Sequence, residues 1–163
     1  MKRNGRLARG KRMKAGAALN RTALARTARK RVPARDTGPS KAVRRLVLGR
    51  EGMRCAACGI SVTDGPWSVQ HRQARGMGGT ADPAANSPSN LILLCGSATS
   101  PGGCHLACEN RDPHMHGRGF WLYSWESPAL VPVMLASEHG SGLAVWLGDD
   151  GEYATVPPEG VAA

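Results

Sequence analysis

The chain has 163 residues and a formal net charge of +10, a length that suits one domain with a tail rather than two well-buried cores. Aromatic residues make up only 4% of it, whereas glycine and proline are frequent, so a bound metal would help a thin core. No apolar run is long enough to cross a bilayer, and the N-terminus lacks the apolar stretch of a secretion signal. We therefore expect a cytoplasmic protein with no membrane partner.

The N-terminal segment carries most of the positive charge. Residues 1–36 hold 13 of the 22 lysines and arginines against one acid, a net +12, while the rest has 9 basic against 11 acidic residues, a net −2. We predict that residues 1–39 form a disordered arm that binds nucleic-acid phosphates without reading sequence. A solvated tail or an organelle transit peptide is the alternative.

A helix is predicted after Ser40, whose hydroxyl can cap it. Val43, Leu46 and Val47 then fall on one face, and Gly52 suits the end of the helix.

The middle of the chain predicts a strand, a long loop, a second strand and a short helix. The first strand is expected over residues 67–71 and the second over residues 91–94, closed by Cys95. The loop 72–90 is too long for a compact domain unless it is functional. The helix is expected over residues 104–110.

The C-terminal segment, residues 113–163, is predicted to be a small β-rich extension. Strand-like patches lie at residues 120–125, 130–135 and 143–147, and the last leads through a predicted Asp-Gly hairpin turn toward Tyr153.

The cysteines predict a structural zinc site, since clustered cysteines in a reducing compartment more often bind metal than form disulfides. Cys55 and Cys58 have the spacing that directs two thiolates to one tetrahedral ion. Cys95 and Cys104, at a strand end and a helix start, are expected to complete the site. Cys108 is the competitor, because it lies four residues after Cys104; otherwise it is a small buried thiol.

Five short motifs follow one another in the middle third of the chain. They are Cys55-x2-Cys58-Gly59, Gln70-His71, Asn90-Leu91, Leu94-Cys95 and Cys104-His105. This succession resembles the HNH endonuclease family, especially its phage-encoded members.

The resemblance implies an α+β fold with a ββα-metal core and zinc knuckle over residues 40–112. It implies a metal-dependent endonuclease that hydrolyses DNA phosphodiester bonds. For a phage protein it also implies the host cytoplasm and a role beside terminase in genome packaging; a restriction-type or homing nuclease is the other enzymatic interpretation.

The resemblance also assigns roles in catalysis. His71 matches the general base, a task that suits a side chain with a pKa near neutrality, and Asn90 matches the residue that pins the intervening loop. His105, with Glu109 on the same helix face, would hold a divalent cation such as Mg²⁺, Mn²⁺ or Ni²⁺. Gln70 stands where the family usually has Asp or His. It would bind the ion weakly, act through water, or leave the ion to the other two residues.

Arg72 and Arg75, just after the first motif histidine, are predicted to contact DNA phosphates. The rival function is a zinc-finger DNA-binding protein without nuclease activity, and the glutamine at position 70 is the feature that favours it.

Overall fold

The computed structural model describes residues 38–76, 80, 82–136, 142 and 144–159. The chain divides into two units, Met1–Arg35 and Asp36–Ala163. The predicted basic arm, apart from its last two residues, lies outside the described residues. The second unit mixes α and β structure, with two small sheets and a few short helices.

Helix α1 spans Lys41–Arg50 and begins as its cap predicts. The Ser40 side chain accepts a hydrogen bond from the Val43 N–H at 3.2 Å. Val47 is fully buried, but Leu46, predicted on the same apolar face, is 44% exposed. Val43 packs against the core as predicted, and Leu48 takes the place expected for Leu46.

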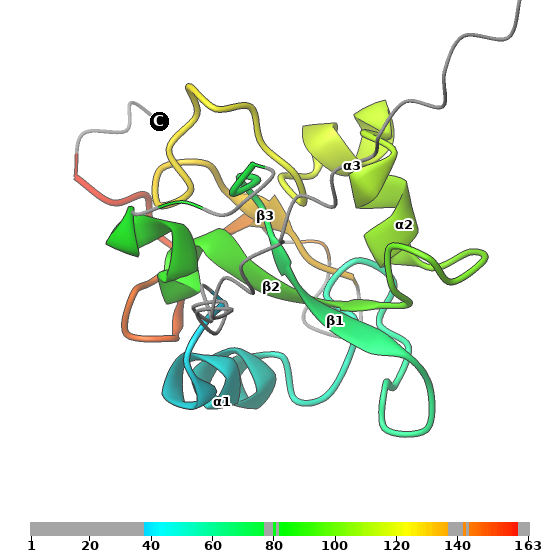
Figure 1. Ribbon diagram of the computed structural model, residues 1–163. Coiled ribbons are helices and arrows are strands. Elements are labelled where there is room, and N and C mark those ends of the chain that lie inside the picture. Colours follow the sequence, from blue (N-terminus) through cyan, green and yellow to red (C-terminus); the bar gives the residue numbers. More distant parts are fainter. Residues whose placement is uncertain (1–37, 77–79, 81, 137–141, 143, 160–163) are drawn as a thin grey trace, which may run out of the picture. The chain divides into compact units, whose positions relative to one another are not determined.

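Strand β1 (Trp67–His71) pairs antiparallel with β2 (Leu91–Cys95), so that Trp67 lies opposite Cys95. Helix α2 (Cys104–Glu109) follows and contacts both strands, while α1 also contacts β2 (Figure 1). Every residue of β2 before Cys95 is buried. The predicted order of two strands and a short helix is confirmed, with the helix ending one residue earlier than predicted.

The connection between the two strands carries structure of its own. Two short 3₁₀ helices, η1 (Pro83–Asn86) and η2 (Pro88–Asn90), occupy its second half. Asp82 caps the first of them by accepting a hydrogen bond from the Ala84 N–H at 2.9 Å. The second of them ends directly before β2.

The C-terminal segment differs from its prediction in two places. Residues 120–125 form turns rather than a strand, because consecutive side chains there are buried without alternation and contact the chain after β1 through a bridge between Gln73 and Leu122. A helix that the sequence analysis does not predict, α3 (Pro113–Gly117), precedes them. Asp112 caps it by accepting from the His114 N–H at 2.8 Å.

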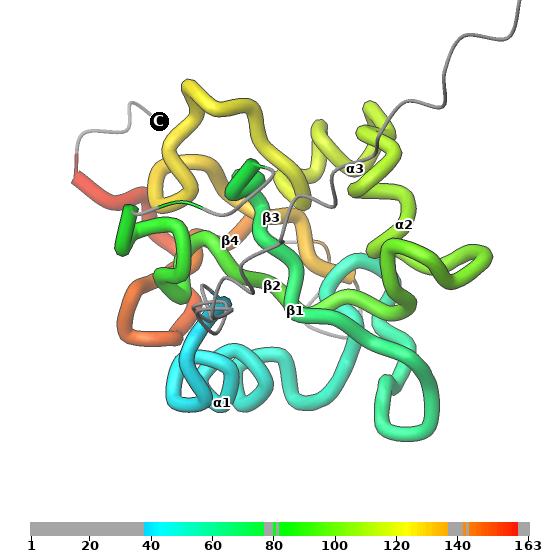
Figure 2. Tube along the Cα trace, viewed as in Figure 1, coloured from blue at the N-terminus to red at the C-terminus, as the bar shows by residue number. Residues whose placement is uncertain are grey.

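A second small sheet closes the fold. Its strands are β3 (Val133–Met134), β4 (Ala144–Leu147) and β5 (Tyr153–Ala154), all antiparallel, in the order β3-β4-β5. The strands are shorter than the predicted patches, but the hairpin through the Asp-Gly turn is confirmed. Figure 2 traces this path in orange and red.

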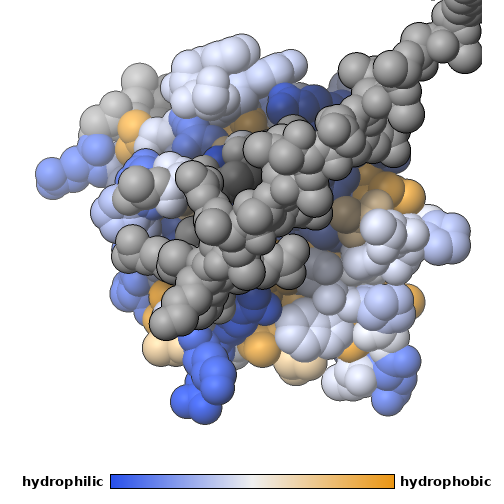
Figure 3. Space-filling view, viewed as in Figure 1, coloured by the Kyte–Doolittle hydropathy of each residue, from blue (hydrophilic) through white to orange (hydrophobic). Residues whose placement is uncertain are grey.

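One hydrophobic core joins the hairpin to the C-terminal segment. It contains the apolar residues of β2 together with Phe120, Val133, Val145 and Leu147. On the face shown in Figure 3, hydrophobic and hydrophilic areas of the described residues are small and interleaved. None of the helices formed by the described residues has the length and apolar character that a membrane crossing requires.

A buried ionic contact fixes α1 to the beginning of β2. Arg50 pairs with Glu51 at 2.9 Å, and both side chains are almost completely buried. Arg50 also donates to the carbonyl oxygens of Pro88 at 3.1 Å and Leu91 at 2.5 Å, while the Tyr153 hydroxyl donates to Glu51. The backbone on both sides of residue 90 is therefore held from α1.

Candidate metal centre and histidine pocket

The Cys-x2-Cys segment forms a tight turn docked on β2. The Gly59 N–H donates to the Cys55 carbonyl at 2.7 Å, and Gly59 adopts a left-handed φ of 78°. The Ala56 N–H donates to the Leu93 carbonyl at 3.0 Å. This contact brings Cys55 and Cys58 beside the end of the strand.

The four cysteines predicted as zinc ligands lie together. The sulfur atoms of Cys55, Cys58, Cys95 and Cys104 are all within 4.8 Å of one another, and those of Cys58 and Cys95 are 3.8 Å apart. A tetrahedral zinc ion with Zn–S bonds of about 2.3 Å separates its sulfur ligands by about 3.8 Å. Thiolates are also soft ligands that suit zinc. The cluster could therefore hold a metal ion such as zinc.

Two glycines allow the long gap between the last two ligands to close. Gly96 and Gly103 adopt φ values of 83° and 89°. A Cβ atom on Gly103 would lie only 2.9 Å from the Cys95 carbonyl oxygen. Because the chain can approach itself this closely, the Cys104 N–H lies 3.4 Å from the Cys95 sulfur, to which it donates. Such donation favours a thiolate ligand.

Thiols of the cluster differ from one another in their pKa values, and the fifth cysteine lies apart from them. The Cys104 thiol lowers the pKa of Cys55 to about 4, whereas burial raises the pKa of Cys58 to about 11. Binding of a cation would displace the remaining protons, since zinc ligates thiolates. Cys108 lies outside the cluster, only 3% exposed, and burial raises its pKa to about 12. It has the character of a buried thiol.

His71 ends β1 with its ring half-buried. Its Nε2 lies 3.0 Å from the Asn86 Oδ1, within hydrogen-bonding distance. Burial, and then the nearby cations Arg75 and Arg44, lower the pKa of His71 despite the opposing effect of Asn86. The imidazole is therefore held neutral at neutral pH, which is the form that can accept a proton.

The Asn90 side chain bonds to the backbone of the connection between the two strands. Its side-chain oxygen accepts from the Gln73 N–H at 2.7 Å, and its amide nitrogen donates to the carbonyl oxygens of Gln73 at 3.2 Å and Ala85 at 2.9 Å. The Arg72 N–H in turn donates to the Asn90 carbonyl at 2.8 Å. Asn90 thus fixes the backbone that follows His71.

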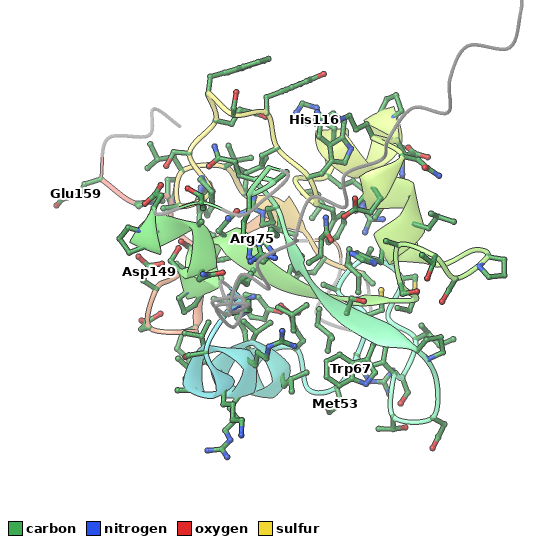
Figure 4. The ribbon with its side chains drawn as sticks, in the orientation of Figure 1. Met53, Trp67, Arg75, His116, Asp149 and Glu159 are labelled. Atoms are coloured by element: carbon green, nitrogen blue, oxygen red, sulfur yellow. The ribbon has the colours of Figure 1, made fainter. Side chains whose placement is uncertain are left out.

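His71 opens into a cavity of about 60 Å³ that also involves α2. The residues that line it include Gln70 and Glu109, together with Cys108 and Arg111. Arg75, labelled in Figure 4, projects from the loop after β1. Residues of β1 and α2, among them His71 with its neutral imidazole and the acidic residue Glu109, therefore line one pocket.

His105 lies next to this pocket and is joined to it through Glu109. Its Nε2 is 3.6 Å from the Glu109 Oε1, and ligands of one ion with bonds of about 2.1 Å lie up to about 4.2 Å apart. Burial lowers the pKa of His105, while Glu109 and the Ser97 backbone oppose the shift. The buried Nδ1 atom of His105 has no hydrogen-bond partner among the described residues.

The predicted phosphate contact of Arg72 is wrong. Arg72 is 1% exposed, and burial lowers the pKa of its guanidinium to about 9. Its nitrogen atoms donate to the backbone carbonyls of Ser89, Gly119, Pro128 and Val131 at 2.7 to 3.2 Å, and to that of Pro132 at 3.5 Å. Arg72 therefore ties β1 to the C-terminal segment and cannot reach DNA. Arg75 is half-buried close to His71, and its phosphate contact stays a prediction.

Replacing Arg72 is expected to destabilise the fold strongly. Arg72→Met keeps the apolar stem but removes the donor from these buried or partly buried carbonyls, so the free energy of unfolding should fall by at least about 3 kcal/mol. Urea unfolding followed by circular dichroism measures the change. Arg45→Met on the exposed face of α1 is the matched control, with an expected change within about 0.5 kcal/mol. Equal urea midpoints for both variants would contradict the role assigned to Arg72.

Comparison with protein families, with curated proteins and with solved structures gives no match. Function is therefore argued from the site itself.

Proposed function

We propose that the protein is a zinc-stabilised, metal-dependent endonuclease that hydrolyses DNA phosphodiester bonds, with a core of the HNH type. The observation that carries the proposal is the pocket in which His71 and Glu109 meet. It lies where an antiparallel pair of strands and a short helix come together beside four clustered cysteines. This order of elements supports a ββα-metal core.

His71 has the properties of a general base in this proposal. Its neutral ring faces a polar pocket, and Asn86 contacts its Nε2 at 3.0 Å, which orients the ring. Asn90 holds the backbone immediately after His71. The imidazole accepts a proton from the water that attacks the phosphorus atom.

Glu109 and His105 are the residues that would hold the catalytic cation. Their 3.6 Å separation fits two ligands of one ion. A divalent cation bound there supplies charge that stabilises the leaving oxygen. Gln70 lines the same pocket, and its amide oxygen is a third, weaker donor.

The positive charges of the chain fit an anionic substrate. Arg75 and Arg44 both act electrostatically on His71, and the N-terminal 36 residues add a net charge of +12. Contacts of this kind strengthen DNA binding by releasing counterions and are independent of sequence. The link to terminase stays a prediction of the family resemblance alone.

The second candidate function is a zinc-containing DNA-binding protein without nuclease activity. Gln70 is the observation that favours it, because a neutral amide occupies a pocket position where a charged or imidazole ligand would bind a cation more tightly. This protein would bind DNA through its basic residues and leave it uncut.

Incubation with supercoiled plasmid distinguishes the two functions. Purified protein with its zinc content verified is mixed with plasmid alone or with Mg²⁺, Mn²⁺ or Ni²⁺. The nuclease is expected to produce nicked or linear DNA only when one of these ions is added. Tight DNA binding with bound zinc and no cleavage under any condition would overturn the nuclease and support the binding protein.

A further inference from the structure

Three aromatic rings between α3 and β3 pack in a row that we call the aromatic ladder: those of Trp121, Tyr123 and Trp125. The Tyr123 and Trp125 rings are stacked with centroids 4.4 Å apart and planes 5° from parallel, and Tyr123 packs edge-on against Trp121 at 5.0 Å. His116, labelled in Figure 4, contacts both inner rings. Trp125, the outermost ring, is 77% exposed. Tyr123 covers one of its faces, so the stack ends at an accessible indole.

The segment that carries the ladder is fixed to the strand of His71. The Gln73 side-chain nitrogen donates to the carbonyl oxygens of Tyr123, Ser124 and Glu126 at 3.3, 3.1 and 2.8 Å. The Glu126 carboxylate accepts from the Tyr123 N–H at 2.6 Å. The backbone that carries the indole is therefore fixed to Gln73, which follows His71 by two residues in the chain, and a binding surface requires such support.

A cavity of about 250 Å³ lies between the ladder and the loop after β1. Tyr123, Trp125, Arg111 and the glycine at position 76 contribute to its wall. Its volume is below the range of about 300 to 1,000 Å³ typical of pockets for drug-sized ligands. It suits one planar heterocycle rather than a larger ligand.

This cavity adjoins the pocket of His71. The two share three lining residues, Ala74, Arg111 and Leu122. Arg111 is exposed, and its guanidinium carbon lies 5.5 Å from the centroid of the Trp121 ring, so a cation is positioned at the boundary between the two cavities. Aromatic rings beside an arginine are the combination that binds single-stranded nucleic acid.

We propose that Trp125 and this cavity hold one unpaired nucleobase of the DNA substrate, with Arg111 binding the phosphate next to it. The inference rests on the proposed nuclease function and names its substrate class: DNA with an unpaired nucleotide adjacent to the scissile phosphate. The base stacks on the indole and its phosphodiester enters the pocket of His71. A fully paired duplex cannot place a base there without unpairing it.

Binding of short labelled oligonucleotides, measured by fluorescence anisotropy without added divalent cation, tests the proposal. The probes are a thymidine oligonucleotide and an abasic oligonucleotide of the same length. Trp125→Ala is expected to weaken binding of the thymidine probe about tenfold, the effect of losing one stacked base, and to leave binding of the abasic probe unchanged. Arg111→Gln should weaken binding of both probes alike, because it removes a phosphate contact.

Trp67→Ala is the matched control. Trp67 is 36% exposed and lies on β1 opposite Cys95, well separated from His116 in Figure 4. Its loss should leave the affinity for either probe unchanged. Unchanged binding of the thymidine probe by Trp125→Ala, or equal weakening for both probes, would overturn the proposal.

Cleavage of the thymidine probe separates this inference from the nuclease itself. Cleavage by the wild type that Trp125→Ala retains in full overturns the base site and leaves the nuclease intact. Base-dependent binding without cleavage under any ion overturns the nuclease, while the base site stands.

Discussion

Cys55→Ser is expected to leave the Asp36–Ala163 unit without its metal and largely unfolded at 25 °C. The four sulfurs lie within 4.8 Å of one another, so serine at one corner removes a thiolate that bound zinc requires. A structural zinc site contributes about 10 to 16 kcal/mol, whereas a domain is stable by only about 5 to 15 kcal/mol. Zinc content by mass spectrometry and thermal melting by circular dichroism measure the effect.

The fifth cysteine supplies the control for this experiment. Cys108 is buried to nearly the same degree as Cys55 but lies outside the cluster. Cys108→Ala should keep one zinc per chain and lower the free energy of unfolding by about 1 to 2 kcal/mol through a small cavity. A folded Cys55→Ser protein with one zinc per chain would show that the cluster does not hold the metal.

His71→Ala should reduce metal-dependent plasmid cleavage by a factor of about 10² to 10⁴, the contribution of a positioned general base. The ring is only partly buried, and the contact that it loses in the structure is the one with Asn86, so folding should change by about 1 kcal/mol. Zinc content and DNA affinity should stay at the wild-type level. Initial rates of plasmid nicking, with affinity from anisotropy, give the comparison.

His114→Ala is the matched control for the base. His114 is exposed on α3 and belongs to no part of the proposed site, so its removal should leave the nicking rate unchanged. Cleavage by His71→Ala at the rate of the control would remove His71 from catalysis. The proposed nuclease would then need another base.

The elements with strong local signals could be predicted from the sequence. Ser40 caps the first helix, the apolar run from Leu91 forms a buried strand, and the Cys-x2-Cys spacing brings two sulfurs together. Each signal depends on a few neighbouring residues. Cys95, rather than Cys108, was predicted as a ligand because it ends a predicted strand, and the sulfur positions agree with that prediction.

The long-range contacts could not be predicted in the same way. Arg72 is buried by carbonyls from residues up to 131, although the alternation of side chains along an extended chain already places it opposite to His71. The contact of Asn86 with His71 has no local signal. The start of α3 does have a local signal, because Asp112 followed by Pro113 is typical of a helix N-terminus. Aromatic residues at 120–125 favour a strand, but ring packing and burial determine their conformation instead.

The contacts of Asn90 have an evolutionary consequence. Its side chain joins both ends of the segment between His71 and β2, by bonding to both backbone groups of Gln73 at one end and to Ala85 near the other. Insertions or deletions in the middle of this segment would change its length without removing the Asn90 bonds at either end. Related chains could therefore vary the length of this segment while the backbone that follows His71 stays in place.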